Sequence, residues 1–399
     1  MPRDAAPNAW ARRLAELRAS GADLCDLTEA NPTRLGLSAL GEAERSALTP
    51  VLTHALEAAY QPDPRGLSSA RAAIAAYYAE RGLIADAEHL VLTTGTSESY
   101  AHLFRLLANP GDTVLVPAPS YPLFEPLAAL ESVRLRSFSL AWDGRWHLDL
   151  DTLASALAAG ARAVVIVQPN HPTGTGLDER ECAALEDLCV RHGAAIIADE
   201  VFGDFAWRLE PGEPAGAARR RSRGLPSLVG ERRAQTFVLS GISKVCGLPQ
   251  LKLGWIWAGG PAAVRERAIQ ALEWIADLFL SVASPVQLAL PALLAHRHAF
   301  QSRTLERITR NRTRLAAAAK RRPELSALEA DGGWVACLRL PARLGEEAWA
   351  LELLEHGVIA HPGHFYDFSF GPVAVVSLIV DPEIFSQACE RLEALLAVG

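Results

Sequence analysis

The sequence predicts an α/β protein with a large domain built on a mostly parallel β-sheet between two layers of helices, and a smaller α+β domain. Three observations support this fold class. Between residues 85 and 260, short strand-like runs alternate with helical patterns, which is typical of a parallel sheet. Several runs are apolar throughout, as expected for strands covered on both faces. After residue 262, long helical stretches replace this alternation.

Six strand-like runs make up the predicted sheet. They lie at residues 89–94, 112–118, 162–168, 194–200, 235–241 and 253–259. Helices are predicted between them at 97–108, 122–131 and 178–192. The last of these should end at Gly193, because glycine readily adopts the backbone conformation that ends a helix.

The remaining chain predicts the smaller domain. Its expected elements are helices at 262–280 and 286–321, a strand within 329–340, a helix near 345–356, a strand at 374–380 and a helix at 382–397. The first 45 residues have no strand partner in the large domain by pattern, so we place them with this domain. The predicted division is therefore 46–285 for the large domain, and 1–45 with 286–399 for the small one.

Charge and hydropathy exclude two classes of partner. Lys and Arg total 39 against 46 Asp and Glu, a net charge of −7, whereas a nucleic-acid-binding protein needs a basic face. The basic run at 219–223 lies among Gly, Pro, Ala and Ser and predicts a solvated loop. The most apolar stretch, 278–295, is interrupted by Pro285 and Pro291. It predicts two buried helices separated by a kink rather than a membrane span.

The cysteines and the N-terminal segment indicate a cytoplasmic protein. The six cysteines form no CxxC pair and no zinc pattern, so reduced thiols and no metal site are expected. Residues 8–18 resemble a short amphipathic helix rather than a signal peptide.

Lys244 is the first candidate for chemistry. It follows the 235–241 run in a turn rich in Ser and Gly, and the carboxyl ends of strands are where α/β folds hold ligands. A lysine that is partly desolvated has a lowered pKa and a nucleophilic amine. Alone, such a lysine is usually a solvated surface residue, so the assignment depends on its neighbours.

Asp199 ends the apolar 194–200 run. A carboxylate at the end of a buried strand needs a cationic or hydrogen-bonding partner. A protonated pyridine nitrogen would be one such partner. A helix N-cap or a structural salt bridge is the alternative.

Two more elements point to a phosphate and a planar ring. Residues 94–97, Thr-Gly-Thr-Ser, join a strand to a helix, and a helix N-terminus with small residues suits a phosphate. Ser or Thr capping of the helix explains the same residues without a ligand. Tyr121 precedes Pro122 and could hold its ring flat against a planar ligand, or it could be a core or loop tyrosine.

The segment 168–176, QPNHPTGTG, is the fifth element. Pro172 and Gly174 predict a turn directly after a buried strand. Asn170 or His171 could then point a donor at a ligand oxygen. The alternative is a simple strand-to-helix loop.

In this order the five elements resemble the class I/II aminotransferases of fold type I, which use pyridoxal 5′-phosphate (PLP). The resemblance runs from LTEANPT at 27–33 to the final strand. The 28 positions from His171 to Asp199 (199 − 171) match about the interval that this family keeps between the corresponding residues. The resemblance implies a sheet of seven strands.

The resemblance also implies roles for individual residues. Lys244 would carry PLP as a Schiff base and move a proton, Asp199 would pair with the ring nitrogen, and Tyr121 would stack on the ring. Tyr60 would reach the phosphate of the neighbouring subunit, which implies a homodimer. The other implied cofactor-binding residues are Gly95, Thr96, Ser97, Asn170, His171, Phe202, Ser243 and Lys252.

Four positions depart from the family pattern. His171 replaces an asparagine, Phe202 a tyrosine, Lys252 a phosphate-binding arginine, and Val375 the arginine that binds the substrate carboxylate. Lys252 keeps the charge but loses the bidentate fork. Phe202 cannot donate to the phenolic oxygen of PLP, so we expect the cofactor Schiff base to stay protonated to a higher pH than is usual for the family.

The departure at Val375 leaves the substrate carboxylate without its usual partner. Arg34 is a candidate replacement, although it could be an exposed arginine that follows a turn. Asn31, His364 and Tyr366 are expected near the substrate, with local packing as the alternative.

The implied reaction is transamination from an amino acid or related amine to a 2-oxo acid. The alternative is a PLP-dependent lyase, decarboxylase or cyclase of the same fold. A PLP-binding transcription regulator is disfavoured because the chain is acidic and only about 25 residues precede the substrate segment.

Overall fold

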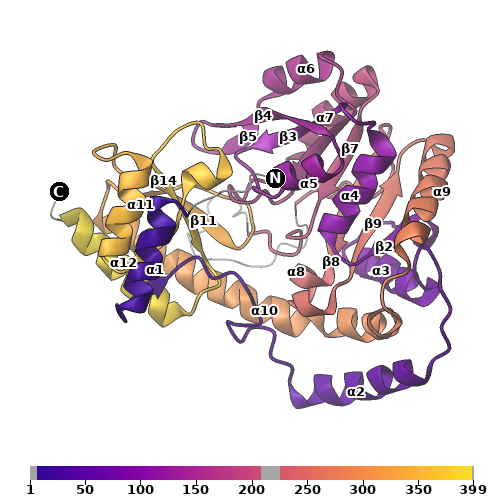
Figure 1. Cartoon of the computed structure of the whole chain (residues 1–399), viewed down its shortest axis with the longest axis horizontal. Coiled ribbons are helices and arrows are strands. Elements are labelled where there is room, and N and C mark those ends of the chain that lie inside the picture. Colours follow the sequence, from indigo (N-terminus) through magenta and orange to yellow (C-terminus); the bar gives the residue numbers. More distant parts are fainter. Residues whose placement is uncertain (1–6, 208–224, 398–399) are drawn as a thin grey trace.

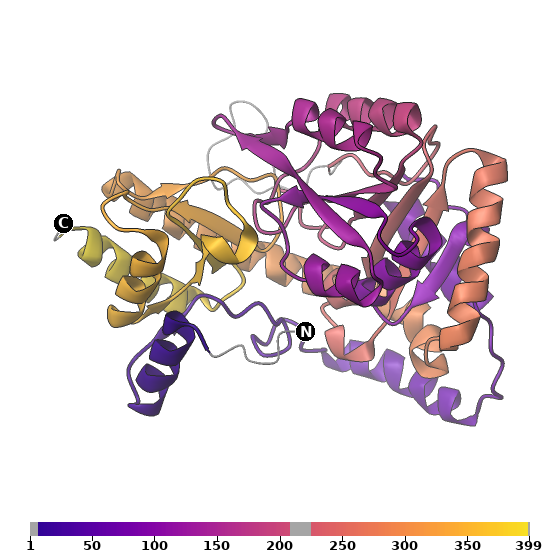
Figure 2. The ribbon, with the colours of Figure 1, turned by 45° about the horizontal axis from the view of Figure 1, so that its top comes forward.

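The structure is a computed structural model that describes residues 7–207 and 225–397. Figures 1 and 2 show a larger part around a central sheet and a smaller part that contains α1, α11 and α12, with α10 running through both. The basic run at 219–223 lies outside the described residues.

The central sheet has eight strands in the order β2-β9-β8-β7-β6-β3-β4-β5. Five successive strands, from β8 to β4, are parallel, while β9 is antiparallel to both of its neighbours. The prediction of a mostly parallel sheet is confirmed. The expected number of seven is one too low, because the short strand β5 pairs antiparallel with β4 at the edge. The strands are β2 Leu90–Thr93, β3 Thr113–Ala118, β4 Arg134–Trp142, β5 Trp146–Leu148, β6 Ala163–Val167, β7 Ala195–Asp199, β8 Thr236–Gly241 and β9 Gly254–Gly259.

Helices cover both faces of this sheet, which explains why its inner strands are apolar throughout. Every residue of β6 is buried. Val165 packs with the layer formed by α4 Thr96–Leu107, α5 Phe124–Leu130 and α9 Ala262–Phe279. Val164 and Ile166 pack with the opposite layer, because successive side chains of a strand point to opposite faces. That layer contains α3 Ser68–Glu80, α6 Leu150–Ala158, α7 Glu179–His192 and the first half of α10.

The ends of α7 show how local sequence sets a helix. Asp178 accepts hydrogen bonds from the first turn while Glu181 bonds back to its backbone, which forms a capping box. Gly193 ends the helix in the left-handed conformation, with φ +64°. The predicted helix at 178–192 and its glycine stop are confirmed.

The smaller part contains a four-stranded antiparallel sheet in the order β10-β11-β14-β13. The strand β1 of the N-terminal segment pairs in parallel with β12, so the start of the described chain packs with its C-terminal part. The elements are α1 Ala9–Ala19, β1 Cys25–Asp26, β10 Ser326–Ala327, β11 Val335–Arg339, α11 Glu346–Glu355, β12 Val358–Ile359, β13 His361–Pro362, β14 Val373–Ser377 and α12 Pro382–Ala397.

The helix α10, Ser284–Arg321, belongs to both parts. Its first half, with Leu290 and Leu293, packs in the core of the large sheet, and its second half, with Ile308 and Leu315, packs in the core of the small sheet. Because this helix continues without a break, a domain boundary at residue 285 stays a prediction. The other helical segments are α2 Glu42–Glu57, which lies along α10, α8 Ile242–Val245, and the short η1 Ala87–His89, η2 Pro249–Leu251 and η3 Gly363–Tyr366.

The apolar stretch 278–295 spans the end of α9 and the start of α10. The expected break lies between them, with Pro285 in the first turn of α10. The expectation that both helices are buried is wrong for the end of α9, because Leu278 and Leu280 are more than 70% exposed. Within the described ranges, no helix has the length and apolar character that crossing a membrane requires.

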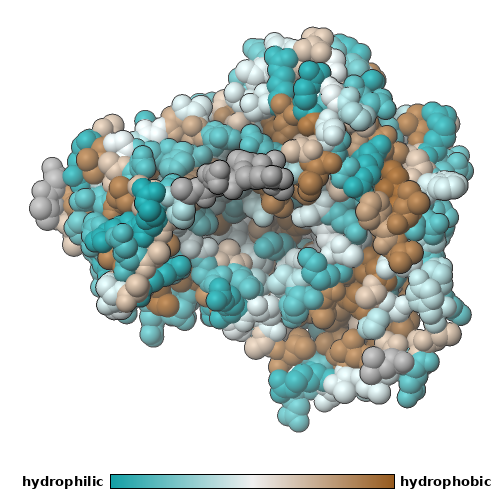
Figure 3. Space-filling model, in the orientation of Figure 1, coloured by the Kyte–Doolittle hydropathy of each residue, from teal (hydrophilic) through white to brown (hydrophobic). Residues whose placement is uncertain are grey.

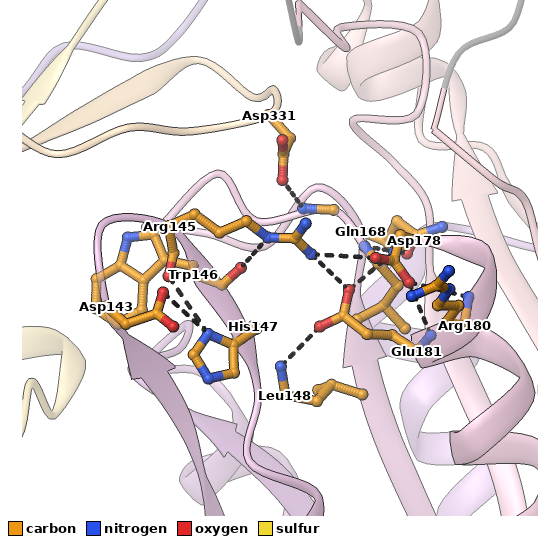
Figure 4. Close-up of polar contacts among 12 residues, drawn as sticks. Asp143, Arg145, Trp146, His147, Leu148, Gln168, Asp178, Arg180, Glu181 and Asp331 are labelled. Carbon is orange, nitrogen blue, oxygen red and sulfur yellow. Dashed lines mark hydrogen bonds and ion pairs between the residues drawn. The ribbon is translucent and has the colours of Figure 1, made fainter. Parts of the chain in front are cut away.

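The segment 168–178 is fixed from two sides, as Figure 4 shows. Asp331, from the loop between β10 and β11, accepts a hydrogen bond from the backbone N–H of Gly176 at 2.9 Å. Arg145, beside β5, reaches the carboxylate of Asp178 at 3.5 Å and that of Glu181 in α7 at 3.0 Å. These contacts hold in place the loop that carries His171.

Candidate active site

A cavity of about 420 Å³ lies where the large sheet faces the small one, within the usual size range of small-molecule sites. One wall comes from the carboxyl ends of β6, β7 and β8 and the start of α4. The other comes from residues 27–30, β11, β13, η3 and β14. Ten positions singled out from the sequence line it: Gly95, Thr96, Tyr121, His171, Asp199, Phe202, Ser243, Lys244, Tyr366 and Val375.

Lys244 lies in α8, the short helix directly after β8. Burial lowers the pKa of its amine to about 8, and the negative charge of Asp199 offsets part of this effect. The Nζ atom lies 4.7 Å from the ring centre of Trp334 and 5.5 Å from that of Phe202. The amine is therefore desolvated by aromatic rings, and a minor fraction of it is already unprotonated near neutral pH.

Asp199 ends β7, the parallel neighbour of β8, so its carboxylate lies at the same edge of the sheet as Lys244. Its two oxygens accept hydrogen bonds from the backbone N–H of Val201 and from the hydroxyl of Tyr100, both at 3.1 Å. Burial raises the pKa of Asp199 to about 6, and these two donors lower it in part. Tyr100 remains a donor, because burial raises its own pKa well above 10.

The loop from β2 to α4 forms the part of the cavity that suits a phosphate. Gly95 and Thr96 lie at the start of α4, and Ser243 faces them from α8. The first N–H groups of a helix have no partner within that helix and attract anions. Gly254 of β9 approaches so closely that a Cβ atom there would lie 3.0 Å from the Cα of Gly95, so glycine is required for this loop to lie where it does.

Aromatic rings from both walls of the cavity surround His171. Its ring stacks on Phe202 with centroids 6.2 Å apart, and it meets the edges of Tyr121 and Tyr366 at 5.7 Å and 5.5 Å. Burial, and then the charges of Lys244 and His361, lower the pKa of His171 to about 3. The imidazole is therefore neutral, and one of its nitrogens can donate to an oxygen in the cavity.

Apart from Tyr60, which was predicted to reach a neighbouring subunit, three predicted cofactor-binding residues do not line this cavity. Ser97 and Lys252 are exposed, and Lys252 adopts the left-handed conformation with φ +53°. The side chain of Asn170 donates to the carbonyl of Pro119, in the loop after β3, at 3.1 Å and to Thr173 of its own loop at 2.8 Å. Loop turns and strand ends could be located from the sequence, but the direction of each side chain could not.

The expected substrate residues also lie elsewhere, apart from Tyr366. Asn31 accepts hydrogen bonds from the backbone N–H and hydroxyl of Thr33. The exposed Arg34 pairs with Glu29 at 3.2 Å, and His364 faces Glu346 at 3.6 Å. Neither Arg34 nor His364 is among the residues that line the cavity with Val375. Tyr60 is 70% exposed on the surface, and its predicted contact concerns a neighbouring subunit.

The structure adds site residues that sequence reasoning missed, namely Tyr100, Trp334, His361 and Phe365. Tyr100 is one tyrosine within a helix pattern, and nothing in its spacing pointed to Asp199. Trp334 follows two glycines before a strand, which was a weak signal. Of the residues that the structure describes, no group of three or more His, Cys, Asp or Glu is arranged to hold a metal ion.

A family comparison agrees with this geometry. The model for aminotransferase class I and II matches residues 27–385. The chain belongs to this family. The match covers both walls of the cavity and includes Lys244, Asp199 and Val375.

Characterised members of the family show how distant the relatives are. Glutamate-pyruvate aminotransferase AlaA of Haemophilus influenzae is 28% identical over 280 residues, which is 70% of this chain but 65% of that protein, less than two thirds of its length. Arginine–pyruvate transaminase AruH of Pseudomonas aeruginosa is 26% identical over 89% of this chain and 88% of its own. The fold is that of alanine aminotransferase from Pyrococcus furiosus, with a TM-score of 0.83, 19% identity and coverage of 97% and 96% of the two chains.

This aminotransferase family is PLP-dependent, and the cavity fits the cofactor. Lys244 and Asp199 affect one another through their charges, but neither is in an ion pair with a described residue. A buried carboxylate without an ion-pair partner suits a protonated pyridine nitrogen, and the desolvated amine suits attachment to an aldehyde. The start of α4 with Ser243 suits the phosphate.

Proposed function

We propose that this chain is a PLP-dependent aminotransferase that moves an amino group from an amino acid or related amine to a 2-oxo acid. The observation that carries the proposal is the placing of a desolvated amine, Lys244, and a buried carboxylate, Asp199, in one cavity. The relatives reported above are named as aminotransferases, and the lyase, decarboxylase or cyclase alternative is not favoured.

PLP, when bound, supplies an electron sink that stabilises negative charge on the substrate carbon next to the amine. Lys244 attaches the cofactor and then carries a proton at Nζ. With a pKa of about 8, about a quarter of the amine is unprotonated at pH 7.5, so it can both accept and return that proton. Trp334 and Phe202 exclude water from the amine.

Asp199 would hold the proton of the cofactor ring nitrogen, and Tyr100 orients the carboxylate through its hydroxyl. Gly95, Thr96 and Ser243 would hold the phosphate, and Tyr121 would contact the ring. His171 stays neutral and would donate to the phenolic oxygen, a role that Phe202 cannot fill. These roles rest on the cavity lining and the contacts described above.

We also propose a cytoplasmic homodimer. Its support is an apolar surface at the end of α9, where Trp274, Leu278, Phe279 and Leu280 are each at least half exposed. Figure 3 shows hydrophobic residues gathered on the side of the molecule where α9 lies. A second copy that covered this surface could bring Tyr60 to its active site. All six cysteines are free and buried, as expected in a reducing compartment.

The sequence contains three lysines, at 244, 252 and 320, so the attachment point can be tested directly. Borohydride reduction of the purified holoenzyme should fix the cofactor to the peptide that contains Lys244 and to neither of the others. Lys244→Ala should abolish both the cofactor absorbance and turnover in a screen of amino donors with 2-oxo acids. The exposed Lys320 provides the control, since Lys320→Ala should change neither. Turnover retained in Lys244→Ala would refute the proposal.

A further inference from the structure

The position of the missing carboxylate arginine lies inside the cavity wall. Val375 is buried in the middle of β14 and lines the cavity together with Val335 and Trp334. Lys244 is the only lysine or arginine among the described residues that form this lining. Under the proposed function, Lys244 attaches the cofactor and carries a proton, so it does not serve as the partner of the substrate carboxylate. The carboxylate therefore needs another partner on the wall around Val375.

His361 lies directly beside Val375. It is the register partner of Val375 in the antiparallel pair of β13 and β14, and directly opposed residues in such a pair project their side chains from the same face of the sheet. Both residues line the cavity. A carboxylate that reached the position of the absent arginine would therefore meet the imidazole of His361.

The imidazole is held by one hydrogen bond and by aromatic rings. Its Nδ1 atom lies 2.8 Å from the hydroxyl of Tyr366, and its ring centre lies 6.0 Å from Phe365 and 6.5 Å from Trp10 of α1. Burial raises the pKa of Tyr366, so the hydroxyl keeps its proton and can donate to Nδ1. The neutral imidazole then carries its own proton on Nε2, which is free to donate to a ligand.

We propose that His361, oriented by Tyr366, binds the substrate carboxylate in place of the arginine. The inference rests on the proposed function, because it assumes an amino-acid or oxo-acid substrate. Carboxylate binding takes up one proton from solvent at Nδ1, so that the imidazole becomes cationic and Tyr366 turns from donor to acceptor. The complex therefore gains the charge pair that arginine supplies in other members, but only with a proton.

The charges around His361 set the pH at which this uptake occurs. Burial lowers the pKa of His361 from its ordinary value of 6.5, and Asp26 of β1 partly offsets this. Tyr366 and the neutral His171 add no charge, and Lys244 is the cation that lines the same cavity. A bound carboxylate raises the pKa of His361. Carboxylate affinity should thus be flat at low pH and fall by up to about tenfold per pH unit above the pKa of the free imidazole.

The test measures proton uptake on the holoenzyme with an unreactive probe. We would titrate 3-phenylpropanoate, and separately the neutral 3-phenylpropanamide, by calorimetry in buffers of different ionisation enthalpy between pH 6 and 8.5. The acid should bind with uptake of close to one proton at pH 8, and the amide with none. His361→Gln should abolish the uptake and weaken acid binding by about tenfold or more without changing amide binding. Tyr366→Phe should lessen both effects.

Two matched variants serve as controls. His356→Gln removes an exposed histidine that bonds only to Glu352 in the described chain, and should leave proton uptake unchanged. Arg34→Gln removes the alternative cation and should also leave it unchanged. Retained cofactor absorbance shows that each variant is folded and loaded.

Several results would overturn the inference. They are the absence of acid binding, binding without proton uptake, or loss of acid binding in Arg34→Gln but not in His361→Gln. A higher kcat/KM for 2-phenylethylamine than for L-phenylalanine would also count against it, because the carboxylate would then contribute nothing. None of these results bears on cofactor attachment at Lys244, which peptide mapping tests separately, so failure here is distinguishable from failure of the proposed function.

Discussion

The buried carboxylate of Asp199 should make the apoprotein less stable as pH rises, and Asp199→Asn should remove this dependence. The folded pKa of Asp199 is about 6, against an ordinary value of 3.8. The folded state therefore binds this proton more tightly than the unfolded state does. The stabilisation is present at low pH and is lost as pH rises towards and through 6.

The magnitude follows from the shift. At about 1.4 kcal/mol per pKa unit, a rise from 3.8 to about 6 corresponds to a total of about 3 kcal/mol. Titration between pH 5 and pH 8 accounts for about 1.4 kcal/mol of this total, because at pH 5 the unfolded group is already ionised while the folded group is mostly protonated. Apoprotein stability should fall by that amount from this one residue.

Urea unfolding of apoprotein and of Asp199→Asn, at equal protein concentration and at several pH values, provides the assay. Titrating groups other than Lys244, whose pKa the charge of Asp199 raises in part, are alike in both proteins, so the difference in unfolding free energy mainly reports Asp199. That difference should change by about 1.4 kcal/mol between pH 5 and pH 8, in favour of the variant at high pH. A difference that stays constant over this range would refute the reasoning. Bound PLP should restore the stability of the wild type alone.

Three further predictions concern neighbours of the cofactor. Phe202→Tyr adds a hydroxyl that donates to the phenolic oxygen alongside His171, so the pH midpoint of the cofactor absorbance should fall by about one unit; an unchanged midpoint would mean that the added hydroxyl does not reach this oxygen. Tyr100→Phe removes one of the two donors to Asp199, so it should raise the pKa of that carboxyl further. It should also weaken PLP binding by about tenfold, as measured by fluorescence titration. Unchanged PLP affinity would show that the hydroxyl is dispensable. Gly254→Ala places a methyl group within about 3 Å of Gly95. It should lower the free energy of unfolding in urea by about 1 to 3 kcal/mol and displace the loop between β2 and α4. Wild-type stability would show that this loop can move to accommodate the methyl group.

The central sheet and the two main catalytic candidates could be predicted because their signals are local. A strand covered on both faces must be apolar along its whole length, as β6 is, and polar residues at its end then stand out. Lys244 and Asp199 both follow this rule. The strand β4 was missed because four of its nine residues are exposed Arg or Ser, so it has neither continuous apolarity nor clean alternation.

Residues that depend on tertiary contacts could not be predicted. His361 matters because sheet register sets it beside Val375, and Tyr100 because α4 packs over β8 and β9 and its hydroxyl meets Asp199. Neither relation leaves a mark in sequence spacing. The prediction that the end of α9 is buried was wrong for another reason. A run of apolar residues such as Leu278 and Leu280 has the same composition whether it fills a core or lies on a surface.

The 38 residues of α10 form a rod of about 57 Å that is anchored at one end under the large sheet and at the other under the small one. The two walls of the cavity are thus connected by one continuous helix, and α10 itself contains no flexible loop between them. To tighten around a substrate, the smaller part must pivot with its half of the rod or bend it. Pro291, whose nitrogen cannot donate a backbone hydrogen bond within the helix, lies in the half of α10 that packs against the large sheet. Any movement of the smaller part relative to the larger one should therefore involve bending of α10 rather than rotation about a flexible linker.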